Sequence, residues 1–230
     1  MKITYLGNSG FALERGGGIL AVDCYDPEKH PLLSDESLSQ MRYATALVSH
    51  AHRDHYSPAI WKLNSARFAA GFDVPAPVGV PKMRPGQTVA PNGMQVTAYG
   101  STDEGVSFHI VWDGVSVFHA GDLNDWHWRD EGGEDYARGE EAKFLQELAK
   151  IKSGIQNIDL AFFPVDPRMG SDYYRGAILF CKEMHPVRFM PMHFGRAFKP
   201  PQAFYEEIAP LTTLLEPPAI DKSMLCPIAR

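Results

Sequence analysis

The chain has 230 residues, of which 44% are hydrophobic and 22% are charged, so one domain can bury a full core of its own. Its formal net charge of -6 and pI near 5.8 exclude a general electrostatic attraction to phosphate backbones or anionic lipid. We therefore expect a single domain over residues 1–230 whose partners include neither nucleic acid nor a membrane.

Cysteine usage and the start of the chain favour a reducing compartment. Cys24, Cys181 and Cys226 are far apart and form no C-x-x-C pair, which predicts reduced, mostly buried thiols. The first residues contain no apolar signal region, and no run of eighteen apolar residues occurs anywhere. We expect a cytoplasmic protein, and the sequence leaves a homo-oligomer open.

Short strand-like runs broken by glycine and proline dominate the first half of the chain. Alternating apolar residues predict strands at residues 2–6, 10–14, 19–23, 45–49, 78–80, 88–90, 95–99 and 106–112. Asp113 and Gly114 then predict a hairpin that continues into a strand at residues 115–119. These runs indicate a sheet laid down in sequence order.

Helices and buried strands alternate in the second half. Helical periodicity appears at residues 57–65, 134–152, 171–184 and 201–208. Two short apolar runs between breakers, at residues 158–165 and 187–192, predict buried strands. The whole pattern predicts an α/β fold in which two sheets pack together with helices outside.

Four potential metal ligands lie within six positions, directly after an apolar strand: His50, His52, Asp54 and His55. Residues i and i+2 of an extended segment point to the same side, so His50 and His52 can hold one ion together. Asp54 and His55 then turn away and can reach a second ion. Imidazole and carboxylate suit zinc and similar divalent cations, whereas the histidines would repel one another when protonated without a metal.

The pattern H-x-H-x-D-H at residues 50–55 resembles the signature of the metallo-β-lactamase superfamily. In chain order, residues 2–7 and Asp23 resemble its first strands and their acidic residue, and residues 118–122 resemble its Gly-Asp motif. Residues 191–195 resemble the segment of its last metal histidine. A stretch like residues 164–168 is typical of the branch that includes ascorbate-6-phosphate lactonase. The resemblance spans nearly the whole chain and implies a four-layer αββα sandwich of two mixed β-sheets with helices outside.

The resemblance also implies a site for two divalent metal ions, with zinc expected and manganese or iron as alternatives. The implied ligands are His50 and His52 on the first metal, Asp54, His55 and His193 on the second, and Asp122 between them. Asp122 and His193 each follow an apolar strand, where a sheet presents ligands at its edge. Considered by itself, either residue is at least as compatible with an ordinary surface position as with a metal ligand.

One ligand of the family pattern is absent. The family supplies another histidine to the first metal from the loop after the strand at 95–99, but residues 100–105 contain none. Asp103 lies nearest that position, with Ser101 and Glu104 beside it, and a carboxylate there would favour manganese or iron. Alternatively His127 or His119 takes the position, or the protein works with one metal. Loop counting favours Asp103.

Several residues near the predicted ligands are candidates for substrate binding. Trp126 and His127 follow Asp122 and are compatible with a pocket wall or with simple packing of an aromatic loop. The cations Arg168, Arg196 and Lys199 follow predicted strands and could hold a phosphate or carboxylate of an anionic substrate, although exposed cations are common.

These features predict a metal-dependent hydrolase of a small-molecule ester, lactone or phosphorylated substrate. A hydroxide held between the metals would attack, with Asp122 bridging them and Asp54 orienting a ligand water and passing a proton. Two-iron redox enzymes and nucleases of the same fold match the chain less well, since neither a fused flavin domain nor an added nucleic-acid-binding domain is visible. A metal-binding or ligand-sensing protein with an incomplete first site is the alternative without catalysis.

Overall fold

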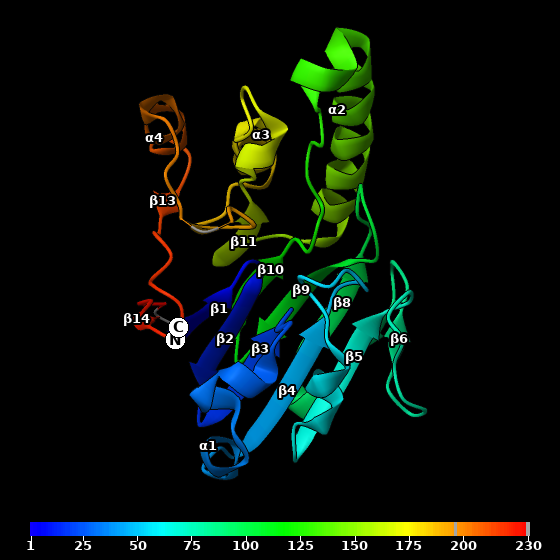
Figure 1. The fold of residues 1–230 in the computed structure, drawn as a ribbon, viewed down its shortest axis with the longest axis vertical. Helices are drawn as coiled ribbons and strands as arrows, with labels where there is room; N and C mark the ends of the chain where they lie inside the picture. The colour runs from blue at the N-terminus through cyan, green and yellow to red at the C-terminus, as the bar shows by residue number, and fades with distance from the viewer. Residues whose placement is uncertain (196, 229–230) are drawn as a thin grey trace.

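The computed structural model describes residues 1–195 and 197–228, which form two mixed seven-stranded sheets (Figure 1). The first sheet has the spatial order β14 (Ser223–Leu225), β1 (Lys2–Gly7), β2 (Gly10–Arg15), β3 (Gly18–Val22), β4 (Tyr43–Val48), β5 (Ala66–Gly71) and β6 (Lys82–Met83). The second has the order β13 (Thr213–Leu214), β12 (Arg188–Met192), β11 (Leu160–Pro164), β10 (Val115–His119), β9 (Ser107–Trp112), β8 (Gln95–Tyr99) and β7 (Thr88–Val89). The prediction of two mixed sheets is confirmed.

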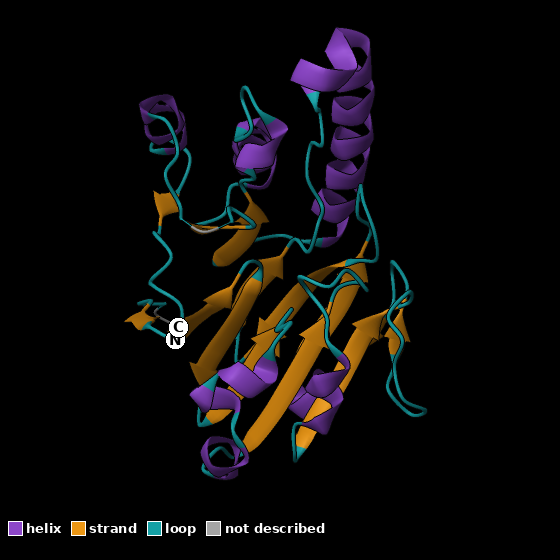
Figure 2. Cartoon of the chain, in the orientation of Figure 1, coloured by secondary structure: helices purple, strands orange, loops and turns teal. Residues whose placement is uncertain are grey.

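Helices cover the outer sides of the two sheets (Figure 2). Three α-helices lie on the side of the second sheet: α2 (Arg129–Gly154), α3 (Arg175–Met184) and α4 (Gln202–Ile208). The short α1 (Asp35–Ser39) and the 3-10 helix η3 (Pro58–Lys62) lie on the side of the first sheet. The four-layer sandwich expected from the resemblance is therefore confirmed. No helix within the described residues has the length and apolar character needed to span a bilayer.

Burial on both faces explains why the central strands read as continuous apolar runs. In β4, Leu47 belongs to the core shared with the second sheet, whereas Ala46 and Val48 pack in the outer core with Leu38 of α1. Between the sheets, the rings of Phe11 and Phe162 are 4.3 Å apart. The polar residues that follow these strands are therefore held on a rigid, fully packed base.

Strand direction brings the ligand-bearing loops to one edge. Strands β3, β4 and β5 run parallel in the first sheet, and β10, β11 and β12 run parallel in the second. Because the carboxyl ends of parallel strands meet at the same edge, the loops after these strands can converge from both sheets.

The prediction of a strand at residues 78–80 is wrong. These residues form a turn, and the chain pairs only afterwards, in the two-residue strand β6. The helix predicted at residues 57–65 shortens to η3, and the rest of the segment leads into β5, which the periodicity did not predict. Proline and glycine on both sides of Val78 prevent ladder pairing there, while the small residues of β5 carry no clear alternation.

Candidate metal centre

Side chains from five strand ends meet at the shared edge of the two sheets. The cluster from His50 to His55 follows β4, and Asp122 and His193 follow β10 and β12. Asp23 follows β3 and Asp166 follows β11, so two further carboxylates reach the same place. The structure thus brings together residues that are up to 170 positions apart in the chain.

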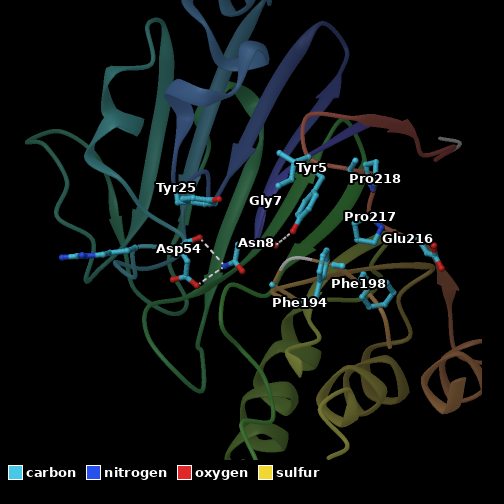
Figure 3. Close-up of a pocket in the computed structure, with 15 residues that line it drawn as sticks. Tyr5, Gly7, Asn8, Tyr25, Asp54, Phe194, Phe198, Glu216, Pro217 and Pro218 are labelled. Atoms are coloured by element: carbon cyan, nitrogen blue, oxygen red, sulfur yellow. Dashed lines mark hydrogen bonds between the residues drawn. The ribbon is translucent and has the colours of Figure 1, made fainter. Parts of the chain in front are cut away.

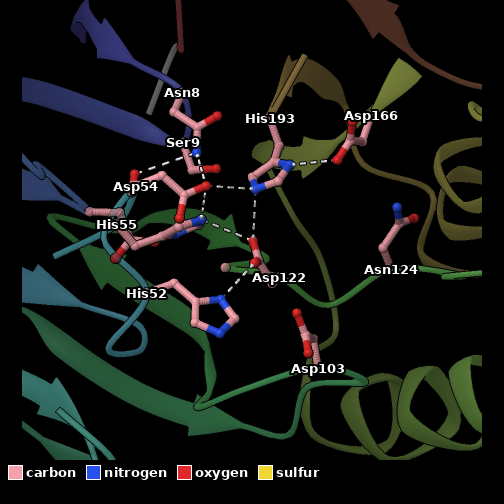
Figure 4. A network of polar contacts seen from close by, with 12 residues as sticks. Asn8, Ser9, His52, Asp54, His55, Asp103, Asp122, Asn124, Asp166 and His193 are labelled. Atoms are coloured by element: carbon pink, nitrogen blue, oxygen red, sulfur yellow. Dashed lines mark hydrogen bonds and ion pairs between the residues drawn. The ribbon is translucent and has the colours of Figure 1, made fainter. Parts of the chain in front are cut away.

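Asp122 lies between two groups of histidines (Figure 4). Its Oδ2 is 3.3 Å from His50 Nε2 and 3.8 Å from His52 Nδ1. Its Oδ1 is 3.0 Å from His55 Nε2 and 3.5 Å from His193 Nε2. One carboxylate therefore presents a different oxygen to each group, which is the arrangement a bridging ligand needs.

The two groups match the two ligand sets that the resemblance implied. The potential ligand atoms of His50, His52 and Asp122 lie within 4.8 Å of one another, as do those of Asp54, His55 and His193. In the second group, Asp54 Oδ2 is 3.3 Å from His193 Nε2 and 4.0 Å from His55 Nε2. Each group could hold one ion, with Asp122 shared.

The chemistry of these atoms fits a bound cation. His50 and His55 are fully buried, and Asp122 and His193 are 3% and 4% exposed. Nε2 of all three histidines and Oδ1 of Asp122 have no hydrogen-bond partner among the described residues, although they converge at ion-pair distances. Buried polar atoms without partners are costly, so imidazole and carboxylate pointed at one another without hydrogen bonds suit divalent metal ions.

The charges within the cluster depend strongly on one another. Burial lowers the pKa of His55, but the Asp122 and Asp23 carboxylates outweigh it and raise that pKa well above the usual value. Burial also lowers the pKa of His193, yet the Asp166 and Asp54 carboxylates beside its ring raise it to about 9. For Asp122, burial raises the pKa, but the surrounding histidines hold it well below its ordinary range. The raised pKa values of His55 and His193 favour protons that offset the carboxylate charge, and a divalent cation would displace those protons.

Asp23 fixes the orientation of histidines from both groups. It accepts hydrogen bonds from Ser49 N at 2.7 Å and from Ser49 Oγ at 2.6 Å, and its Oδ2 is 2.8 Å from His55 Nδ1. Ser49 Oγ is in turn 2.8 Å from His50 Nδ1. A carboxylate that orients the far nitrogen of a metal-binding histidine is a common support of such sites.

The second group has supports of its own. Asp166 Oδ2 is 3.1 Å from His193 Nδ1, and the same carboxylate accepts hydrogen bonds from the Arg168 guanidinium. Asn8 Nδ2 donates to Asp54 Oδ2 at 3.0 Å. The sequence assigned no role to Asn8, Ser49 or Asp166 and none beyond family likeness to Asp23. For Asp23 and Asp166, the position directly after an apolar strand was the available signal.

Asp103 lies beside the first group without joining it. With His52 and Asp122 it lines a cavity of about 360 Å³ over the cluster, but among the described residues neither ligand group includes its carboxylate. Burial, together with the negative charge of Asp122, raises its pKa. Asp103 therefore lies in the loop where the family has its histidine, but its carboxylate is outside both ligand groups. Its role as a ligand stays a prediction.

The two histidines proposed as alternatives to Asp103 have both ring nitrogens engaged. His119 Nε2 is 2.8 Å from the carbonyl oxygen of Ser9, and its Nδ1 accepts from Gly121 N. His127 Nε2 is 3.3 Å from the carbonyl oxygen of Asp172, and its Nδ1 accepts from the amide of the residue two positions later. Neither histidine belongs to a ligand group among the described residues, which favours Asp103 over both.

The predicted substrate-binding residues divide into two sets. Trp126 and Arg168 line the 360 Å³ cavity, and Trp126 also donates from Nε1 to the Asp122 carbonyl oxygen and packs edge-on against His193. His127 is buried and held by Asp172 rather than lining this cavity. Lys199 is exposed and does not line it, and Arg196 lies outside the described residues.

Comparisons with known proteins agree with this geometry. The family model described as "Beta-lactamase superfamily domain" matches residues 2–193. A protein named a metal-dependent hydrolase from Ignicoccus hospitalis is 25% identical over 218 residues, which cover 85% of this chain and 83% of that protein.

Two solved structures share the fold. A metallo hydrolase from Ignicoccus hospitalis has a TM-score of 0.63 at 20% identity and covers 98% of this chain and 99% of its own. CmlA, a diiron β-hydroxylase from Streptomyces venezuelae, has a TM-score of 0.62 at 11% identity, with 97% of this chain and 53% of that chain covered. At these identities the likeness shows the fold and leaves the chemistry to be argued from the residues.

Proposed function

Because the chain belongs to the metallo-β-lactamase superfamily, we propose that it is a metal-dependent hydrolase of a small-molecule ester, lactone or phosphorylated substrate. The observation that carries this proposal is Asp122, whose two oxygens face two separate groups of buried, unpartnered histidine nitrogens. The name of the Ignicoccus hospitalis relative supports the same reaction class. Two divalent metal ions, with zinc the expected species, would occupy the two groups.

Metal ions held by these residues would polarise the scissile bond and lower the pKa of a water molecule to roughly 7. The chain itself contributes orientation and proton transfer. The Asp54 side chain is 49% exposed, faces the cavity, and is held by Asn8, so it can orient a water and accept its proton. The Trp126 ring packs edge-on against His193 and forms part of the wall of the same cavity.

Arg168 gives the cavity a positive charge for an anionic substrate group. Its guanidinium is anchored on Asp166, yet 66% of the side chain stays exposed. An anchored guanidinium with free N–H groups suits a phosphate or carboxylate.

The alternative is a metal-binding or ligand-sensing protein without turnover. Asp103 in the loop of the missing histidine favours this reading, because a first site with two imidazoles and a carboxylate at its edge could bind its ion weakly. Metal content measured together with hydrolysis separates the two functions.

The test is elemental analysis of zinc-loaded protein, combined with assays on 4-nitrophenyl acetate, γ-butyrolactone and bis(4-nitrophenyl) phosphate. We expect close to two metals per chain and metal-dependent turnover of at least one substrate. Asp122→Asn and His193→Ala should lose metal and activity but stay folded, because both residues lie on loops beyond strands. Asp159→Asn, which changes a buried acid at the start of β11, is the matched control. Absence of metal from the loaded protein overturns the proposal, and metal without turnover supports the sensing alternative.

A further inference from the structure

A second and larger cavity, of about 850 Å³, adjoins the metal centre (Figure 3). Its walls are mainly aromatic and aliphatic, with Tyr5, Tyr25, Phe194, Phe198, Pro217 and Ile220 among the lining residues. Its volume lies within the range of small-molecule sites, and apolar walls with few polar groups are typical of such sites. Of the residues that have a role in the proposed reaction, only Asp54 and Asn8 line this cavity, so the reaction does not explain the rest of it.

These two residues connect the large cavity to the metal centre. Asp54 lines both cavities, and Asn8, which lines the large one, holds the Asp54 carboxylate by a hydrogen bond of 3.0 Å. Phe194, on the wall of the large cavity, directly follows His193 in the chain. A molecule bound over the cluster could therefore extend past Asp54 into the large cavity without leaving the protein surface.

The polar groups labelled in the large cavity lie toward its two ends. Asp54 and Asn8 lie at one end and Glu216 lies at the other, next to Pro217, with Tyr5 and Phe194 between them (Figure 3). The Tyr5 hydroxyl donates to the Asn8 carbonyl oxygen at 3.3 Å, so the wall it contributes is mainly the apolar ring. The aromatic and proline walls between Asp54 and Glu216 therefore suit an apolar group.

A glycine keeps the middle of the cavity open. Gly7 has a φ of +97°, and a Cβ at this position would lie 3.3 Å from Tyr25 Oη and 3.6 Å from Ile220 Cδ1. A side chain there would fill the space between the two walls and would also be strained by the backbone conformation. The turn after β1 thus leaves room for a ligand beside Asn8.

We propose that this cavity binds the apolar acyl part of the substrate while the hydrolysable bond lies over the metal centre. The inference rests on the proposed function and narrows its substrate class to esters or lactones with a medium-length acyl chain. The smaller cavity, lined by His52, Asp103 and Arg168, receives the polar end of such a molecule. The smaller, charged cavity thus matches the polar end of the substrate, and the larger, mainly apolar cavity matches its acyl chain.

The test compares 4-nitrophenyl butyrate with 4-nitrophenyl octanoate. Each buried methylene contributes roughly fourfold to kcat/KM, so the four additional methylenes should raise it by at least about tenfold even with incomplete burial. Ile220→Asp places a charge on the wall and should remove this preference. Val187→Asp is the matched control, because Val187 is 51% exposed, close to the 54% of Ile220, but does not line the cavity.

Binding of N-phenyl-1-naphthylamine, an uncharged fluorescent probe, tests the cavity without hydrolysis. The wild-type protein and Val187→Asp should bind it, and Ile220→Asp should bind at least about tenfold more weakly. Probe binding that is sensitive to Ile220→Asp, with no ester hydrolysed, supports the apolar site and contradicts only the proposed function. Hydrolysis with equal kcat/KM for both esters, or a chain-length preference that Ile220→Asp leaves intact, overturns the inference.

Discussion

Replacing Asp23 by Asn should weaken metal binding although Asp23 is not a predicted ligand. Asp23 contacts His55 directly and reaches His50 through Ser49 Oγ, so one buried carboxylate orients a histidine of each metal group. Asn has the same side-chain shape as Asp, but its amide nitrogen is a donor. It would face the N–H and O–H groups whose hydrogen bonds Asp23 accepts. At least one of those contacts must be lost.

The expected effect follows from the number of histidines involved. Loss of one such support costs 10- to 100-fold in metal affinity. Because Asp23 serves both groups, we expect roughly 100-fold weaker zinc binding, which is about 2.7 kcal/mol. Asp23 is fully buried, so the metal-free variant should also lose on the order of 1–3 kcal/mol of unfolding free energy for its unsatisfied donor.

Zinc affinity can be measured by competition with a fluorescent chelator, and stability by urea unfolding of the metal-free protein. Asp159→Asn is the control, because Asp159 is 7% exposed and accepts from Ser116 N at 2.8 Å, far from the cluster. It should lower stability and leave zinc affinity unchanged. An Asp23→Asn protein that binds zinc as tightly as the wild type would refute the reasoning.

Three further results are expected. Asp103→His should shift the preference of the first site toward zinc over manganese, and Asp103→Ala should weaken metal binding at that site, both measured by competitive metal loading. A metal-bound structure with Asp103 beyond about 4 Å from both ions would contradict a ligand role. Burial and the nearby Glu141 raise the pKa of Asp125 to about 6, so the folded chain retains a proton that the unfolded chain loses near pH 4, and stability falls as pH rises between those values. The loss is the difference in unfolding free energy between pH 4 and pH 7, measured by urea unfolding, and Asp125→Asn should reduce it by at most about 3 kcal/mol. An unchanged difference would show that Arg175, at 3.6 Å, already compensates the charge of Asp125. Removal of metal by a chelator should lower the melting temperature of the wild type far more than that of His193→Ala.

The local signals in the sequence located most elements well. The strands predicted at residues 95–99 and 115–119 coincide with β8 and β10, where alternation and a tight turn define both ends. The helix predicted from residue 134 begins after Gly133, whose φ of +77° interrupts the longer α2. Besides β5, the strands that were missed are β6, β13 and β14, which have two or three residues each. Strands of two or three residues are too short to show a periodicity, whereas β5 is long enough but its small residues carry no clear alternation.

For the metal centre, the sequence by itself located the predicted ligands that are neighbours in the chain. His50, His52 and His55 could be proposed because they lie within six positions of one another directly after an apolar strand. Only the tertiary structure decided that Asp122 faces both groups, that Asp23 orients histidines of each, and that an apolar cavity adjoins Asp54. The physical reason is that each of these features depends on how two sheets pack and which strand ends meet, and such distances between remote segments leave no periodic trace in the sequence.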